Sequence, residues 1–188
     1  MMRSFRIVAR AFAGVAYPVL LLLVLYAIGL SYLVSGGLVS APPTGRLEQL
    51  AIPVLYLAAA TGLIRYAVTR APFFLWLAAL DVGFLVREYH WRLTGELVYV
   101  NVAVLAAVAL RRYEGFADYF ESRVVAALLV ATFLLYLLSV GFDQHWWRFL
   151  SQSKAVRSTL EELLEVSGHV VLLLLNLVAT PRAMDAAA

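Results

Sequence analysis

The 188-residue chain has no cysteine, a single lysine and few charged residues of either sign. The absence of cysteine excludes disulfides, thiolate-bound zinc, iron–sulfur clusters and thiol catalysis. Charged residues make up 14% of the chain, against roughly 25% in a soluble globular domain. That is too little charge to cover a soluble domain of this length. The composition therefore argues against a soluble enzyme and against a nucleic-acid-binding module.

Hydrophobic residues account for 63% of the chain and occur in long runs. No charged residue lies between Arg10 and Arg46, or between Arg123 and Asp143. Because a helix of about 20 apolar residues crosses the hydrocarbon core of a bilayer, these runs predict an all-α, polytopic membrane protein that forms one transmembrane domain over residues 1–188. The predicted bundle of about six transmembrane helices covers residues 13–33, 48–68, 72–90, 96–110, 123–142 and 159–179.

The connector 111–122 combines aromatic and acidic residues at helical spacing. Tyr113, Phe116 and Phe120 recur on one side, while Glu114 and Glu121 are directed to the other. This pattern is typical of a short amphipathic helix in the headgroup region. We therefore predict one short interfacial amphipathic helix whose aromatic face lies at the lipid boundary.

Arginines are more numerous on the side of the predicted membrane that holds the N-terminus. By the positive-inside rule, both termini are expected to be cytoplasmic. The high content of Ala, Leu, Val and Arg is typical of a GC-rich bacterial genome. These features predict a multi-pass protein of a bacterial inner (plasma) membrane.

The three histidines and several acids gather at the outer face, opposite the predicted termini. His90 ends the third predicted helix, and His145 follows the fifth. Glu165 and His169 lie one turn apart in the outer half of the sixth, on a polar stripe that continues to Asn176 within an arc of about 100°. This clustering does not depend on which way the protein is inserted.

The third predicted helix carries two acids, Asp81 and Glu88, on a shared face. At about 1.5 Å of rise per residue, Asp81 and His169 both lie near the bilayer centre. Ionisable groups are costly there and usually face the bundle interior with a partner. We therefore predict that the third and sixth helices are neighbours and that Asp81 faces His169.

Carboxylates and imidazoles are the ligands that Zn²⁺, Fe and Mn accept without cysteine. The candidate metal ligands are Asp81, Glu88, His90, His145, Glu165 and His169. This pattern predicts a site in the outer half of the bundle that binds a cation, either a metal ion or a proton. The site would serve transport or metal-dependent chemistry on a lipid.

Two other functions are compatible with the same residues. In the first, the chain is an accessory or assembly subunit of a larger membrane complex, and the polar stripe is a contact between helices. A homo-oligomer is expected instead if the chain is a transporter, because so small a protein needs more than one copy to form a path. In the second, it is a redox subunit that carries a b-type haem on His169 and either His90 or His145. Acids at the same depth argue against the haem.

Overall fold

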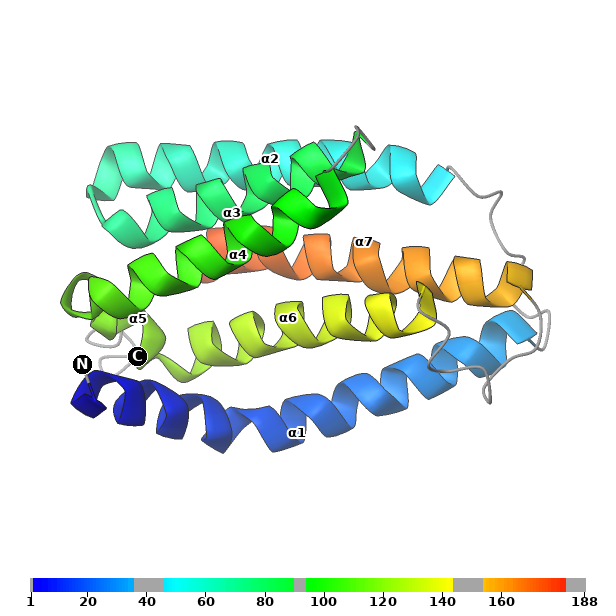
Figure 1. Ribbon diagram of the computed structural model, residues 1–188, viewed down its shortest axis with the longest axis horizontal. Helices are drawn as coiled ribbons and strands as arrows, with labels where there is room; N and C mark the ends of the chain where they lie inside the picture. The colour runs from blue at the N-terminus through cyan, green and yellow to red at the C-terminus, as the bar shows by residue number, and fades with distance from the viewer. Residues whose placement is uncertain (1, 36–45, 90–93, 144–153, 182–188) are drawn as a thin grey trace.

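In the computed structural model, the described residues are 2–35, 46–89, 94–143 and 154–181. Within these ranges the regular structure is entirely helical (Figure 1). The helices are α1 (Met2–Ser35), α2 (Arg46–Thr69), α3 (Pro72–Glu88), α4 (Thr94–Arg111), the 3-10 helix η1 (Tyr113–Gly115), α5 (Ala117–Phe120), α6 (Arg123–Asp143) and α7 (Lys154–Val178). The prediction of an all-α chain is confirmed.

Each predicted transmembrane segment coincides with a helix, although some bounds differ. α1 begins at Met2 and α7 at Lys154, both earlier than predicted. In the described part of the chain, three helices contain segments long and apolar enough to cross a membrane: Gly14–Val34, Gln49–Thr69 and Arg123–Phe142. These segments indicate membrane association. The six-span arrangement stays a prediction, because α3 has only 17 residues and α7 carries charged residues in its first half.

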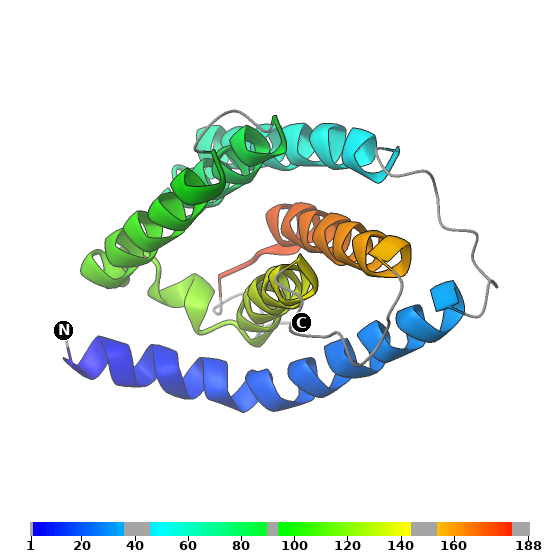
Figure 2. The same cartoon turned by 45° about the vertical axis from the view of Figure 1, so that its right-hand side comes forward.

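Helix α7 lies at the centre of the bundle. It packs against α6, α2 and α1 and also touches α3, while α4 packs on α3 and α1 on α6. The helices therefore follow one another in space as α4, α3, α2, α7, α6 and α1 (Figures 1 and 2). We call the end at which α1 begins and α7 finishes the proximal end, and the end at which α3 and α6 finish the distal end.

A tight turn at the proximal end joins α2 to α3. Arg70 has a φ of 56°, in the left-handed region, and its N–H donates to the carbonyl of Tyr66 at 2.8 Å. A left-handed residue after the last turn is a common way to end a helix. Pro72 then occupies the first turn of α3, where no backbone N–H is needed. The polypeptide chain thus reverses direction between Arg70 and Pro72.

The segment from η1 to α5 closes the proximal end with buried aromatic rings. It consists of two short helical turns in place of the one amphipathic helix predicted, and its aromatic side chains belong to the main hydrophobic core. The ring of Tyr119 stacks on Phe73 of α3 with centroids 4.4 Å apart, and Phe116 meets Trp76 edge to face. The predicted position of this aromatic face at the lipid boundary is therefore wrong, because aromatic rings from α3 offer it a protein surface to pack against.

Candidate metal centre

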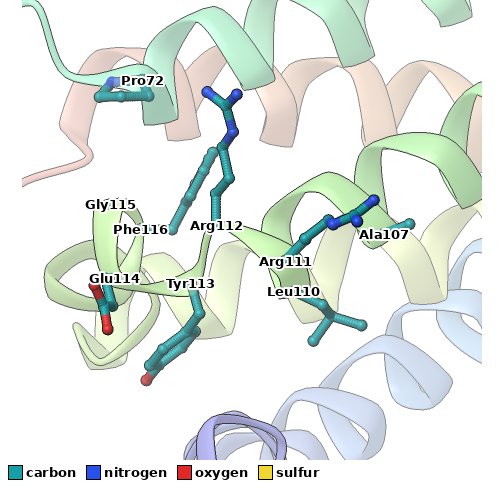
Figure 3. Close-up of a pocket in the computed structure, with 9 residues that line it drawn as sticks. All are labelled: Pro72, Ala107, Leu110, Arg111, Arg112, Tyr113, Glu114, Gly115 and Phe116. Atoms are coloured by element: carbon teal, nitrogen blue, oxygen red, sulfur yellow. The ribbon is translucent and has the colours of Figure 1, made fainter. Parts of the chain in front are cut away.

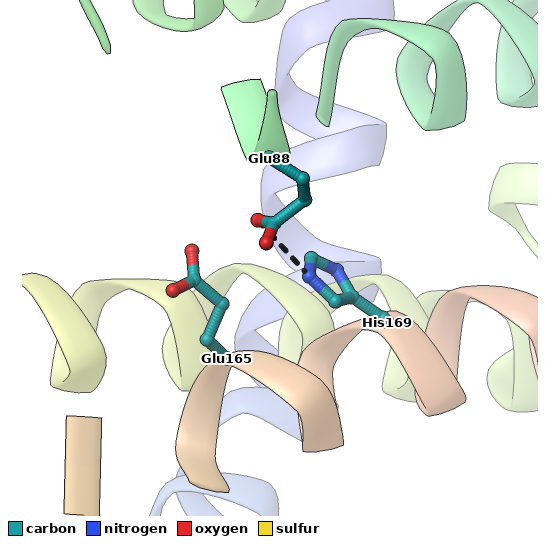
Figure 4. Close-up of side chains that lie close together, drawn as sticks. All are labelled: Glu88, Glu165 and His169. Atoms are coloured by element: carbon teal, nitrogen blue, oxygen red, sulfur yellow. Dashed lines mark ion pairs between the residues drawn. The ribbon is translucent and has the colours of Figure 1, made fainter. Parts of the chain in front are cut away.

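The candidate metal centre is built by the last residue of α3 and two residues of α7 (Figure 4). Glu88 ends α3 and points across to α7. Glu165 and His169 lie one turn apart on α7, so that their side chains leave the same face of the helix. Three of the predicted ligands are thus brought together by two neighbouring helices.

The ligand atoms of these three residues form a compact group. One carboxylate oxygen each from Glu88 and Glu165 and one ring nitrogen of His169 all lie within 4.8 Å of one another. His169 is fully buried and Glu88 is 8% exposed. His169 Nε2 lies 3.4 Å from Glu88 Oε1 and has no hydrogen-bond partner among the described residues. A buried imidazole nitrogen that faces carboxylates without a hydrogen bond is suited to a metal ion.

Tyr136 of α6 fixes the orientation of the histidine ring. Its hydroxyl lies 2.6 Å from His169 Nδ1, so that Nε2 is turned toward the carboxylates. The Tyr136 ring stacks on Phe84 of α3, with centroids 4.1 Å apart. The close approach of α6 to α7 requires Gly168, where a Cβ would lie 3.1 Å from Tyr136 Cζ. A partner that holds the second ring nitrogen is typical of metal-binding histidines.

Sequence analysis missed Tyr136. It stands in the longest apolar stretch of α6, with no charged residue near it in sequence. The available signal is weak: a tyrosine inside an apolar span brings a hydroxyl that must find a partner when buried. That signal does not identify the partner.

Arg87 places a positive charge beside the cluster. Its guanidinium forms an ion pair with Glu165 that joins α3 to α7. The Arg87 side chain is 26% exposed, so it keeps contact with the surroundings of the bundle. The two carboxylates of Glu88 and Glu165 and the guanidinium of Arg87 together carry a net negative formal charge.

Asp81 is buried as predicted, but it forms its hydrogen bond with Asn176 and not with His169. Asn176 Nδ2 donates to Asp81 Oδ2 at 2.9 Å, and both side chains are fully buried. Instead, His169 is paired with Tyr136 and Glu88. The predicted pairing of Asp81 with His169 is therefore not the one observed. The α3 partner of His169 is Glu88, two turns after Asp81, and the partner of Asp81 is Asn176, two turns after His169 on α7. Asp81 does not belong to the compact ligand group.

The two remaining predicted ligands, His90 and His145, lie outside the described residues. Comparison of the chain with protein-family models, curated proteins and solved structures found no match. Function is therefore inferred from the residues themselves.

Proposed function

We propose that this chain is an integral membrane protein of six transmembrane helices. Its cluster of Glu88, Glu165 and His169 would bind a divalent metal ion and support metal-dependent chemistry on a membrane lipid. The proximal end would face the cytoplasm. The observation that carries the proposal is the buried Nε2 of His169, which faces two carboxylates and lacks a hydrogen-bond partner among the described residues.

The apolar outer surface supports the membrane placement. The apolar segment of α1 has a mean hydropathy of 2.2, yet only 17% of it is buried within the protein. On other helices, Ile64, Val68 and Tyr99 are 63%, 79% and 61% exposed. Soluble monomers rarely expose contiguous apolar surfaces of this kind. Lipid is the solvent that suits these faces.

The ligand atoms of the cluster suit a divalent transition metal ion or Zn²⁺. Two carboxylate oxygens and one imidazole nitrogen are accepted by Zn²⁺, Mn²⁺ and Fe²⁺. The net negative charge of Glu88, Glu165 and Arg87 together attracts a cation. Arg87 competes for Glu165, and because it is partly exposed it has room to move away from the carboxylate.

Two features favour chemistry over transport. Three protein ligands leave coordination positions open, as in catalytic rather than structural metal sites, and a bound ion would supply Lewis-acid activation of a carbonyl or phosphoryl oxygen. A cation moving on to the proximal end would meet Arg65. The guanidinium of Arg65 donates to the carbonyls of Asn176, Leu177 and Ala179 at 2.8, 3.0 and 2.7 Å. This fixed positive charge opposes cation passage.

A lipid is the substrate class that the proposed membrane position of the cluster favours. The cluster lies between α3 and α7, inside the proposed membrane region and toward its distal half. A lipid reaches such a site from the bilayer, whereas a water-soluble substrate would have to be desolvated first.

The test is a metal titration of the purified protein in lipid nanodiscs. Zn²⁺, Mn²⁺ and Fe²⁺ are added separately, and bound metal is counted by elemental analysis after dialysis. We expect near-stoichiometric binding of one of these ions by the native protein and strong losses in Glu88→Gln and Glu165→Gln. Tyr136→Phe keeps the ring but removes the hydrogen bond to His169, so we expect about 10- to 100-fold weaker binding. Glu96→Gln is the matched control, because Glu96 is an exposed acid of α4 outside the cluster.

Equal metal contents in the cluster variants and in Glu96→Gln would refute the metal site. If other protein chains co-purify with the native protein and equally with these variants, the result would point to an accessory subunit instead. A Soret absorption band in the purified protein would point to a haem.

A further inference from the structure

A concave pocket lies at the proximal end of the bundle (Figure 3), whereas Glu88 of the metal centre lies at the distal end of α3. The pocket has a volume of about 1000 Å³ and lies where α4 passes into η1. Arg111 and Arg112 line it together with Tyr113 and Glu114, and Ala107 and Leu110 of α4 form an apolar wall.

The two arginines are available to a ligand. Neither guanidinium has a hydrogen bond or an ion pair with any residue that the structure describes, and both side chains are exposed. Figure 3 shows both guanidinium groups extending away from the Glu114 carboxylate, that of Arg112 toward Pro72 and that of Arg111 toward Ala107. Glu114, the acid that lines the pocket, therefore forms no ion pair with either arginine.

Tyr113 adds no negative charge to the pocket. Burial raises the pKa of its phenol, and the hydrogen bond that it donates to Glu121 Oε1 at 3.2 Å raises the pKa further. The phenol therefore stays neutral at physiological pH. The charge of the pocket is set by Arg111, Arg112 and Glu114, with a net positive sum.

The order of polar and apolar residues along α4 matches that of a lipid molecule. Ala107 and Leu110 come before the arginines, on the side of the proposed hydrocarbon region, and Arg111 and Arg112 follow at the helix end. A ligand that satisfies both parts has an anionic head and an apolar tail. Basic pockets at the cytoplasmic ends of membrane helices recognise anionic lipid headgroups in this way.

We propose that this pocket binds the phosphate headgroup of an anionic phospholipid, with the two guanidinium groups on the phosphate and an acyl chain along Ala107 and Leu110. The proposal rests on the proposed membrane placement of the proximal end and not on the metal centre. The two can therefore fail separately: the metal titration tests one and lipid binding tests the other.

The experiment measures lipids that stay bound to the intact protein. The protein is placed in nanodiscs of phosphatidylcholine with a minor fraction of phosphatidylglycerol, released, and weighed by native mass spectrometry. We expect preferential retention of phosphatidylglycerol. Each arginine near an anionic headgroup contributes roughly fivefold in affinity, so Arg111→Gln with Arg112→Gln should reduce this retention by roughly 30-fold.

Arg123→Gln is the matched control. Arg123 is also exposed at the proximal end, at the start of α6, but it does not line the pocket. The control should retain phosphatidylglycerol within about twofold of the native protein, a change smaller than one arginine contributes. Because all three arginines are exposed, we expect the same thermal unfolding temperature in every variant.

A second variant tests the apolar wall without changing charge. Ala107→Trp fills the side of the pocket assigned to the acyl chain and should also reduce retention. Equal losses in the double variant and in Arg123→Gln would overturn the proposal, because the effect would then be one of general surface charge. Displacement of the lipid by millimolar inorganic phosphate would also overturn it, since the site would then be one for free phosphate.

Discussion

Gly168→Ala adds one methyl group where α7 packs against Tyr136 of α6, so it should change both the stability of the bundle and the metal site. A Cβ there would lie 3.1, 3.2 and 3.4 Å from three ring atoms of Tyr136, so the ring must move by a few tenths of an ångström. The ring cannot move freely, because it stacks on Phe84 and its hydroxyl is hydrogen-bonded to His169. Gly168→Ala should therefore strain the contact between α6 and α7.

The magnitude follows from two opposing effects. Overpacking of this kind costs about 1–3 kcal/mol, and replacing glycine by alanine in a helix returns about 0.5–1 kcal/mol. The net expectation for Gly168→Ala is a free energy of unfolding lower by about 1 kcal/mol, within a range of about 0–2.5 kcal/mol. Displacement of Tyr136 also loosens the orientation of His169, so metal affinity should fall by about tenfold or more.

Gly29→Ala is the control, since a Cβ at Gly29 meets nothing within 4 Å. It should be neutral or stabilising by up to about 1 kcal/mol, with no effect on metal binding. The assay is unfolding in mixed detergent micelles, followed by circular dichroism, with metal titration of the same samples. Stabilisation of similar size by both substitutions would refute the packing of Tyr136 against Gly168. A loss of stability in Gly168→Ala with unchanged metal affinity would refute the positioning role of Tyr136.

Three further predictions concern arginines. Arg87→Gln removes the cation that competes for Glu165, so metal affinity measured by competitive titration should rise; an unchanged or lower affinity would contradict a metal role for Glu165. Arg65→Gln removes the hydrogen bonds to the last carbonyls of α7 and should lower the free energy of unfolding by about 2–4 kcal/mol, whereas the exposed Arg70→Gln should change it little. Arg70→Gly relieves a left-handed residue and should raise the unfolding free energy by about 1 kcal/mol; destabilisation would show that the Arg70 side chain has a role that its conformation does not reveal.

The elements of the fold were predictable because their signals are local. Apolar runs, the Pro72 start and the pairing of Glu165 with His169 one turn apart all follow from neighbours in sequence. The position of the η1–α5 aromatics was not predictable in this way. Amphipathic spacing shows that these side chains share a face, but it does not distinguish a lipid surface from the rings of α3.

The site itself was predicted in part, and the error lies in which residues of α3 and α7 are paired. Asp81 and Glu88 are seven residues apart, as are His169 and Asn176, and seven residues are close to two helical turns. A shift of two turns therefore keeps both polar faces together and changes only the partners. The spacing of polar residues within each helix fits both pairings equally well, so it does not reveal which one is adopted.

Electrostatics distinguishes the two registers. The predicted one places Asp81 opposite His169 and, by the same antiparallel count, Glu88 opposite Glu162. In the observed one, Glu88 faces His169 and Asp81 accepts a hydrogen bond from Asn176. Facing acids inside a bundle repel unless a positive charge lies beside them. The observed pairing also brings carboxylate oxygens of Glu88 and Glu165 within 4.8 Å of each other, but it places Arg87 beside Glu165. The observed pairing places a nitrogen beside each carboxylate: Arg87 beside Glu165, His169 beside Glu88 and Asn176 beside Asp81. These pairs depend on how far one helix is shifted along its neighbour, which the spacing within each helix does not supply.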